Sequence, residues 1–317
     1  MVEQGSAKAR PRGRLRPESN PLLTKELRGR MRGARAFVVL TVYLVLLSCF
    51  TAVIYYAYTA GVSGFAGSGN VDTAELGKAV FASVVLIEIF MVAFITPAFT
   101  AAAISGERER KTYELLRATL LSARQLVWGK LASAVTYVFL LILAAVPLES
   151  LAFVMGGVVV EELVLALVIL LVTAFAFAAV GMFFSSLART TLASTVLTYA
   201  TVLLATVGLP LLLFIVALFV AEPLAYGYGS YTPSWVVEVG VIYALAFTAG
   251  LSPITAAVFT QLALQEENAV WYFWYDVDST HRIPIPSGWT IYTVVFLALA
   301  LILLLATILR VRRQETQ

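Results

Sequence analysis

The sequence predicts an all-α, polytopic membrane protein with six transmembrane helices. Hydrophobic residues make up 60% of the 317 residues and charged residues only 13%, a balance that excludes an ordinary soluble domain. Six apolar stretches each reach the roughly 20 residues needed to cross a bilayer. They lie at 36–60, 79–104, 131–155, 162–187, 193–221 and 289–309. The polar remainder is too small for a second, soluble enzyme domain.

Two segments precede the first span. Residues 1–19 are Arg-rich with little apolar surface, so we expect a disordered basic tail. Asn20 followed by Pro21 is typical of a helix start, and the pattern of apolar and basic residues after it predicts an amphipathic interfacial helix over 20–35. A nucleic-acid-binding arm is the alternative for the tail, but a positive-inside signal is favoured ahead of a span. The transmembrane domain then occupies 36–317.

The distribution of basic residues predicts the topology. With six spans and the N-terminus inside, 20 of the 22 Lys and Arg residues lie on the inner side, and only Lys78 and Arg282 lie outside. This is the asymmetry that the positive-inside rule requires. We therefore expect a multi-pass protein of the cell (plasma) membrane with both termini in the cytoplasm.

The stretch 235–264 admits two interpretations. It is apolar enough for a seventh span, but a Ser252-Pro253 pair interrupts it, and a seventh span would move the basic C-terminus outside. We interpret it as two half-helices that enter from the outer side and return, which is tolerated where protein covers the backbone. They belong to an outer region, 222–288, that ends in an aromatic, acidic loop expected to rest among the headgroups.

A long polar interruption, Ser105 to Lys130, lies between the second and third spans. It reads SGERERKTYELLRATLLSARQLVWGK, and it opens with a run of charges before becoming amphipathic at helical spacing. Ser122 with Gln125 three residues later is a capping box, which predicts that a second short helix begins there. The segment is thus expected to form a helix, a break and a helix at the membrane surface.

This segment resembles a known family. A second span followed by SGERERKTYELL, then LS and RQLVWGKL, is similar to the permease subunits of ABC-2 type exporters, which are type V-like ABC transporters. The N-terminal NPLLTKELRGRMRG is similar to the helix that precedes the first span in many such permeases. The resemblance implies export, dimerisation with itself or a sister permease, and separate ABC ATPase subunits. ATP and Mg would then be held by that partner, with no cofactor on this chain.

The resemblance also implies that 105–130 contains the coupling helix that touches the ATPase. A charged inner loop is more often a solvated anchor, but here it would leave an apolar patch exposed on a mixed-charge helix, which favours a partner's groove. The residues that we predict to couple to the ATPase are Glu107, Arg108, Lys111, Tyr113, Glu114, Leu116, Arg117 and Leu120.

Four polar residues inside the spans are candidates for the translocation pathway. Glu88 lies deep in the second span, where a charge costs about 2.5 to 3.5 kcal/mol; it either contacts substrate or protons, or is a buried carboxyl bonded to a neighbouring helix. Thr195, Thr198 and Tyr199 share one face of the fifth span. That face either makes inter-helix hydrogen bonds or lines a cavity at a dimer axis, and we favour the cavity. Glu149 is expected at the outer interface.

The chain carries no convincing catalytic or metal site. It has no G-x-x-x-x-G-K-[ST] phosphate loop, so we expect no ATPase activity on this subunit. The Glu161-Glu162 pair lacks the further residues of a metal-dependent intramembrane protease, and the single histidine, His281, lies in an outer loop. An ATP-independent channel, or a scaffold of an envelope complex, is the alternative function.

Overall fold

Within the residues that the computed structural model describes, six helices are long and apolar enough to cross a membrane. The structure describes Gly29 and residues 34–65, 72–112, 122–226, 235–267, 269–277 and 281–315. The spans are α2 (Ala34–Phe65), α3 (Thr73–Thr100), α6 (Ala123–Val154), α7 (Val160–Leu187), α8 (Thr191–Leu203) continued by α9 (Leu209–Tyr226), and α12 (Gly288–Glu315). The protein is therefore all-α in class and multi-pass, as the sequence predicts. The basic tail 1–19 and nearly all of the predicted interfacial helix 20–35 lie outside the described residues.

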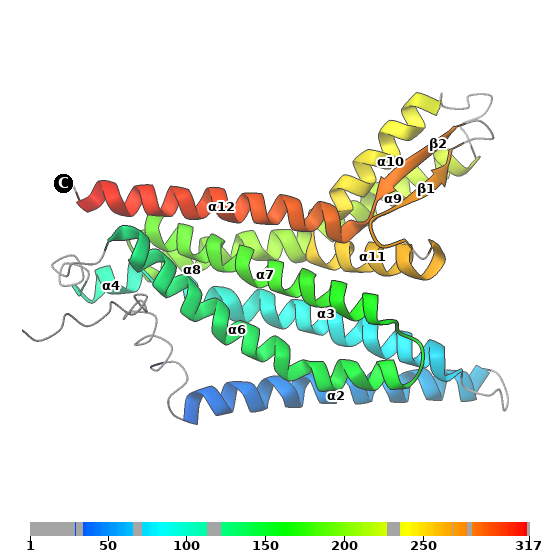
Figure 1. The fold of residues 1–317 in the computed structure, drawn as a ribbon, viewed down its shortest axis with the longest axis horizontal. Coiled ribbons are helices and arrows are strands. Elements are labelled where there is room, and N and C mark those ends of the chain that lie inside the picture. The colour runs from blue at the N-terminus through cyan, green and yellow to red at the C-terminus, as the bar shows by residue number, and fades with distance from the viewer. Residues whose placement is uncertain are drawn as a thin grey trace, which may run out of the picture.

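The bundle is organised around α7. This helix packs against α3, α6, α11 and α12, and its buried face joins Ile169 and Phe177 to Phe296 of α12 in one apolar core. Thr173 and Tyr292 share a buried hydrogen bond of 2.8 Å in the middle of that contact. Figure 1 shows α4 (Ser105–Glu109) and the end of α12 at one end of the bundle and the β1–β2 hairpin at the other. We call these the α4 end and the hairpin end.

The predicted capping box at the start of α6 is confirmed. The Ser122 hydroxyl accepts from the Gln125 amide, and the Gln125 side chain accepts from the Ser122 amide. The prediction of a short helix followed by a separate span at 131 is wrong, because α6 runs unbroken from Ala123 to Val154. Nothing between Gln125 and Lys130 interrupts the helix, since Gly129 lowers helix propensity without removing a backbone hydrogen bond.

The fifth span changes its helix type halfway. A π-helical turn, η1 (Leu204–Gly208), separates α8 from α9. Pro210 follows two residues later and has no N–H to offer the carbonyl of Thr206. A local change of hydrogen-bond spacing accommodates the missing donor.

A sharp bend separates α10 (Trp235–Ala249) from α11 (Pro253–Glu267). The two helices meet at 119° around the predicted Ser252-Pro253 break. Both contact the hairpin, α10 through β2 and α11 through β1, and the Tyr243 hydroxyl donates to the Pro284 carbonyl at 2.8 Å. The pair thus returns to the hairpin end, which fits a re-entrant arrangement.

Glycines at the bend permit close helix contacts. A Cβ on Gly250 would lie 2.4 Å from the side chain of Ile291, and one on Gly288 would lie 2.7 Å from the carbonyl oxygen of Ala256. The first turns of α12 therefore lie against the bend and the start of α11. The remainder of α11 extends past the start of α12 into the hairpin half of the bundle, beside α3 and α7.

The outer region contains a β-hairpin that the sequence analysis missed. β1 (Tyr272–Asp276) pairs antiparallel with β2 (Arg282–Pro286), in the register Tyr272 to Pro286 and Asp276 to Arg282. An ion pair of 3.0 Å joins Arg282 to Asp276 at the far end. The prediction of a loop is wrong for this part of the outer region. The two prolines of RIPIP do not prevent the pairing, because proline is tolerated in a strand where its missing N–H faces away from the partner.

Candidate functional site

The segment around α4 is bound to the start of α6. The Glu107 carboxylate, with a side chain 29% exposed, accepts from the Lys130 ammonium at 3.1 Å, and the Lys130 side chain is only 6% exposed. The Thr112 hydroxyl also donates to Glu107. Lys130 is the last basic residue of α6, and this carboxylate compensates for its burial.

The same segment is bound to the corner between α7 and α8. The Ser185 hydroxyl accepts from the backbone amides of Ile104 and Ser105 at 2.8 and 3.0 Å. The Glu109 carboxylate accepts from both the amide and the hydroxyl of Thr191, each at 2.8 Å. Thr191 is the first residue of α8, so this carboxylate satisfies a free N–H at a helix N-terminus.

Arg108 completes these contacts by donating to the Ala188 carbonyl at 3.3 Å. We call α4 with its partners on α6, α7 and α8 the α4 junction: Ile104, Ser105, Glu107, Arg108, Glu109, Lys130, Ser185, Ala188 and Thr191. Three segments far apart in the sequence, around α4, at the start of α6 and at the α7–α8 corner, thereby meet at one end of the bundle. A displacement of α4 would have to move the ends of α6, α7 and α8 or break these hydrogen bonds.

The chain leaves the α4 junction through a left-handed residue. Lys111 has a φ of 57°, a conformation that costs a non-glycine residue free energy and that ends α4. Of the predicted coupling residues, the structure therefore places Glu107 and Arg108 in the junction and Lys111 immediately after it. The remaining five lie outside the described residues: Tyr113, Glu114, Leu116, Arg117 and Leu120.

Glu88 lies in a buried carboxyl pair. Glu88 is fully buried, and one of its carboxyl oxygens accepts a hydrogen bond of 2.9 Å from the Tyr43 hydroxyl of α2. Glu149 of α6, also fully buried, is close enough to couple electrostatically to Glu88. The two carboxyl groups are close enough to share a hydrogen bond when one of them is protonated; apart from each other, neither oxygen of Glu149 and only one of Glu88 has a hydrogen-bond partner among the described residues. The prediction that Glu149 lies at the interface is wrong, because α6 continues through Pro147 and turns this side chain into the bundle.

The hydroxyl face of α8 packs against the bundle. Thr198 is buried and donates to the Ser194 carbonyl at 2.7 Å, while Ser194 donates to the Ala101 carbonyl of α3. Tyr199 donates to the Phe94 carbonyl at 2.9 Å and stacks on the Phe94 ring. Thr195 is half-buried on the same side. Ser194 and Tyr199 thus make the kind of inter-helix hydrogen bonds that stood as the alternative to a cavity lining, whereas the bond of Thr198 stays within α8.

The four predicted pathway residues form two separate groups. Glu88 faces α2 and α6, whereas Thr198 and Tyr199 belong to the contact between α8 and α3. Sequence reasoning missed Ser185 and Glu149 as partners of the predicted residues. A serine near the end of an apolar helix gives no sign that it will accept from two distant amides, so only the tertiary fold shows this role.

Six apolar helices in the described chain, joined at one end by the α4 junction, define a multi-pass membrane protein. The family model described as "ABC-2 family transporter protein" matches residues 21–316, nearly the whole chain. The chain belongs to this family and is a transmembrane transport subunit of the ABC-2 type. No curated protein matches the chain significantly.

Proposed function

We propose that this chain is the transmembrane subunit of an ATP-driven exporter. Two copies, or one copy and a sister permease, form the translocation pathway, and separate ABC ATPase subunits dock on the segment 105–130. ATP and Mg bind to those ATPase subunits, and this chain supplies no cofactor site and no catalysis. The family of the chain supports this assignment.

The α4 junction is the observation that carries the proposal. A coupling element has to transmit force, and α4 is attached to α6 through Glu107 and Lys130 and to α8 through Glu109 and Thr191. ATPase closure against 105–130 would therefore tilt α3, α6 and α8 together as packed, bistable elements. A loosely attached loop would dissipate the same displacement.

The charge distribution supports an orientation. The α4 end carries the basic residues of the described chain apart from Lys78 and Arg282, and it includes the C-terminal Arg310, Arg312 and Arg313. By the positive-inside rule the α4 end faces the cytoplasm. Both termini are then cytoplasmic in the cell membrane, where an ATPase can reach α4.

The first experiment is co-purification with the ABC ATPase encoded beside this chain. We expect the wild-type pair to purify together in detergent, and the double variant Leu116→Asp/Leu120→Asp to lose the ATPase, because two charges would interrupt the apolar docking patch. Leu187→Asp is the matched control, since Leu187 is 37% exposed at the same end but lies outside 105–130. Monodisperse size-exclusion profiles establish that each variant is folded.

The outcomes separate the two candidate functions. If the double variant alone loses the ATPase, the segment 105–130 is the docking element. If no ATPase binds the wild-type chain, an ATP-independent channel or an envelope scaffold becomes the better assignment.

The pathway residues need a separate transport assay. We propose that Glu88 contributes to the translocation pathway, together with Thr195, Thr198 and Tyr199. Glu88→Gln should lower ATP-driven export in proteoliposomes while expression and ATPase binding stay normal. Unchanged export in that variant would restrict Glu88 to a structural role.

A further inference from the structure

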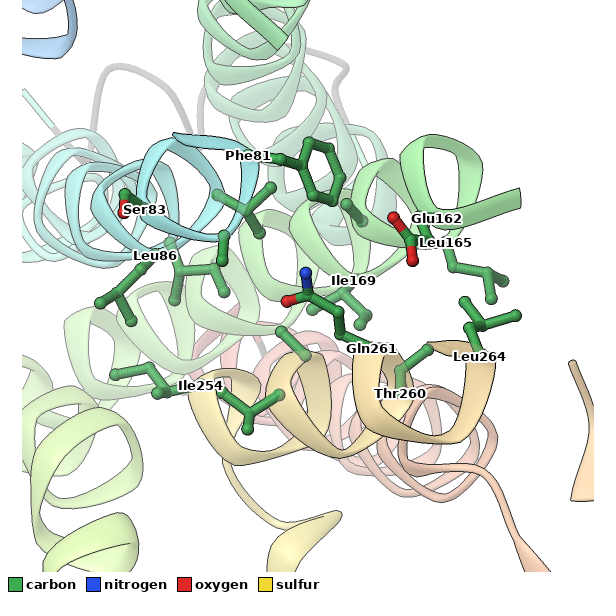
Figure 2. A pocket seen from close by; sticks show the side chains of 16 residues that line it. Phe81, Ser83, Leu86, Glu162, Leu165, Ile169, Ile254, Thr260, Gln261 and Leu264 are labelled. Carbon is green, nitrogen blue, oxygen red and sulfur yellow. The ribbon is translucent and has the colours of Figure 1, made fainter. Parts of the chain in front are cut away.

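A cavity of about 190 Å³ lies between α3, α7 and α11 in the hairpin half of the bundle. Figure 2 shows Phe81 and Leu86 of α3, Ile169 of α7, and Ile254 and Leu264 of α11 around it. An engineered cavity of about 150 Å³ with comparable apolar walls is large enough to bind benzene. The space therefore suits one ring or a short branched chain.

Two polar side chains in this cavity are not satisfied by the protein. Glu162 is 6% exposed; its carboxylate receives a long hydrogen bond of 3.4 Å from Gln265 and interacts with the Val159 amide at the start of α7, and one of its two oxygens has no partner among the described residues. The Gln261 side chain lies at the centre of the view in Figure 2, and no hydrogen bond joins it to another described residue.

Thr260, a third polar residue of the lining, differs from Glu162 and Gln261 in its hydrogen bonds. The Thr260 hydroxyl donates to the Ala256 carbonyl at 2.6 Å and accepts from the Trp289 amide at 2.8 Å. Its hydrogen-bonding capacity is thus used within the protein. In the described chain Glu162 therefore keeps one buried oxygen without a donor, and the half-buried Gln261 keeps its amide available to a ligand.

The surroundings of Glu162 favour a cationic donor. The residue lies in the first turn of α7, where the helix N-terminus stabilises its negative charge. Lys78 is close enough to interact with that charge, but it is not among the residues that line the cavity, and no ion pair joins the two in the described chain. A carboxylate oxygen next to apolar walls matches an ammonium group on an apolar body.

The cavity opens sideways. Two of its lining residues, Leu86 on α3 and Val258 on α11, are 39% and 52% exposed. They lie on the apolar flank of the bundle, which faces lipid in a membrane-spanning chain. A ligand that partitions into the bilayer can therefore reach the cavity without crossing the aqueous phase.

We propose that this cavity binds a small amphiphilic amine. The ammonium group donates to Glu162, the amide of Gln261 orients the polar end, and the apolar part fills the space between α3 and α11. The site goes beyond the proposed function, because binding needs neither an ATPase partner nor turnover. Failure of the binding test would leave the exporter assignment intact, and the converse also holds.

The test compares two probes of nearly equal shape. Tritiated 2-phenylethylamine and 2-phenylethanol are titrated against the full chain in nanodiscs of zwitterionic lipid at neutral pH, where the amine is protonated. We expect the wild-type protein to bind the amine at least about tenfold more tightly than the alcohol, the ratio that one charge-assisted hydrogen bond supplies.

Glu162→Gln keeps the shape of the side chain and removes its charge. We expect this variant to lose the preference for the amine while its weak affinity for the alcohol stays the same. Glu161→Gln is the matched control, because Glu161 is the preceding residue but is exposed. Ala257→Phe fills the cavity, and Val258→Trp narrows its opening without entering the core, so each should abolish binding of both probes.

Each alternative outcome would overturn the proposal. Equal affinity for the amine and the alcohol, or no binding of either, would show that the Glu162 carboxylate does not bind the ammonium group. If Glu161→Gln and Glu162→Gln lower the preference for the amine equally, the amine is attracted by the overall negative charge of this end and not by Glu162 in the cavity. If Ala257→Phe fails to fold, Val258→Trp decides, and undiminished binding in that variant places the ligand elsewhere.

Discussion

The two ends of the bundle are built on opposite principles. At the α4 end, polar side chains pair with one another and with the backbone. Ser185 accepts hydrogen bonds from two backbone amides, Glu109 accepts from Thr191, and Glu107 forms an ion pair with Lys130. In the hairpin half, buried oxygens without partners accumulate, and a cavity opens between three helices. In the described chain those oxygens belong to the Glu88–Glu149 pair, Glu162, Ser252, Ser287 and Thr293, and toward the α4 end to Thr96.

This difference suits the two ends to different tasks: the α4 end to transmitting motion, and the hairpin half to binding a ligand. A region whose polar groups are all paired moves as a unit, because any relative motion costs hydrogen bonds. A region with unpaired groups and empty space can gain free energy by binding a ligand or by rearranging. The following three changes test that contrast, beginning with the largest expected effect.

Gly157→Ala should be the most damaging change in the hairpin half. A Cβ there would lie 1.8 Å from the carbonyl oxygen of Ala74, and two backbone segments cannot yield as a side chain can. We expect the free energy of unfolding, measured by denaturant titration in mixed micelles, to fall by about 3 kcal/mol or more.

Gly156→Ala is the control for that change. Gly156 has open space around it but a φ of +87°, so only backbone strain of about 1 kcal/mol is expected. Equal losses in the two variants would mean that this end depends on turn conformation and not on close packing.

Ser185→Ala should weaken the α4 end by an intermediate amount. Without the hydroxyl, the amides of Ile104 and Ser105 are left unpaired in a buried site, and we expect a loss of about 2 kcal/mol. Ser186→Ala serves as the control, because that hydroxyl only donates to the Phe183 carbonyl within its own helix. A Ser185→Ala variant as stable as Ser186→Ala would contradict the picture of a braced junction.

Glu149→Leu should have the smallest effect and the opposite sign. Among the described residues the Glu149 carboxyl has no partner apart from the Glu88 carboxyl, so replacing it with an apolar side chain of similar size is expected to raise the free energy of unfolding by about 1 kcal/mol. Glu88→Leu should stabilise less, because it leaves the Tyr43 hydroxyl without its acceptor. If Glu149→Leu is the more harmful of the two, Glu149 has a partner that the contacts do not reveal.

The sequence predicts the elements that depend on local chemistry. Hydropathy and the distribution of basic residues predict six spans, and Ser122 with Gln125 predicts the start of α6 to the residue. The break at Ser252-Pro253 also follows from local backbone restrictions. The family resemblance carried by 105–130 agrees with a family match over 21–316.

What the sequence could not predict depends on contacts between distant segments. The pairing of β1 with β2 is hidden by the prolines of RIPIP, and the burial of Glu149 follows from the direction of α6 after Pro147. The cavity at Glu162 requires α11 to lie beside α3 and α7, an arrangement that no periodicity encodes. Of the predicted site residues, those in 113–120 remain predictions, because they lie outside the described chain.

The π-helical turn at Leu204–Gly208 has a consequence for the phase of the fifth span. Such a turn holds one residue more than a regular helix, so it advances everything after it by about 100° around the axis. The face of α8 that meets α3 is therefore not continued along α9. Deleting one residue of this turn would rotate α9 back into phase and turn a different row of its side chains toward the bent helix pair.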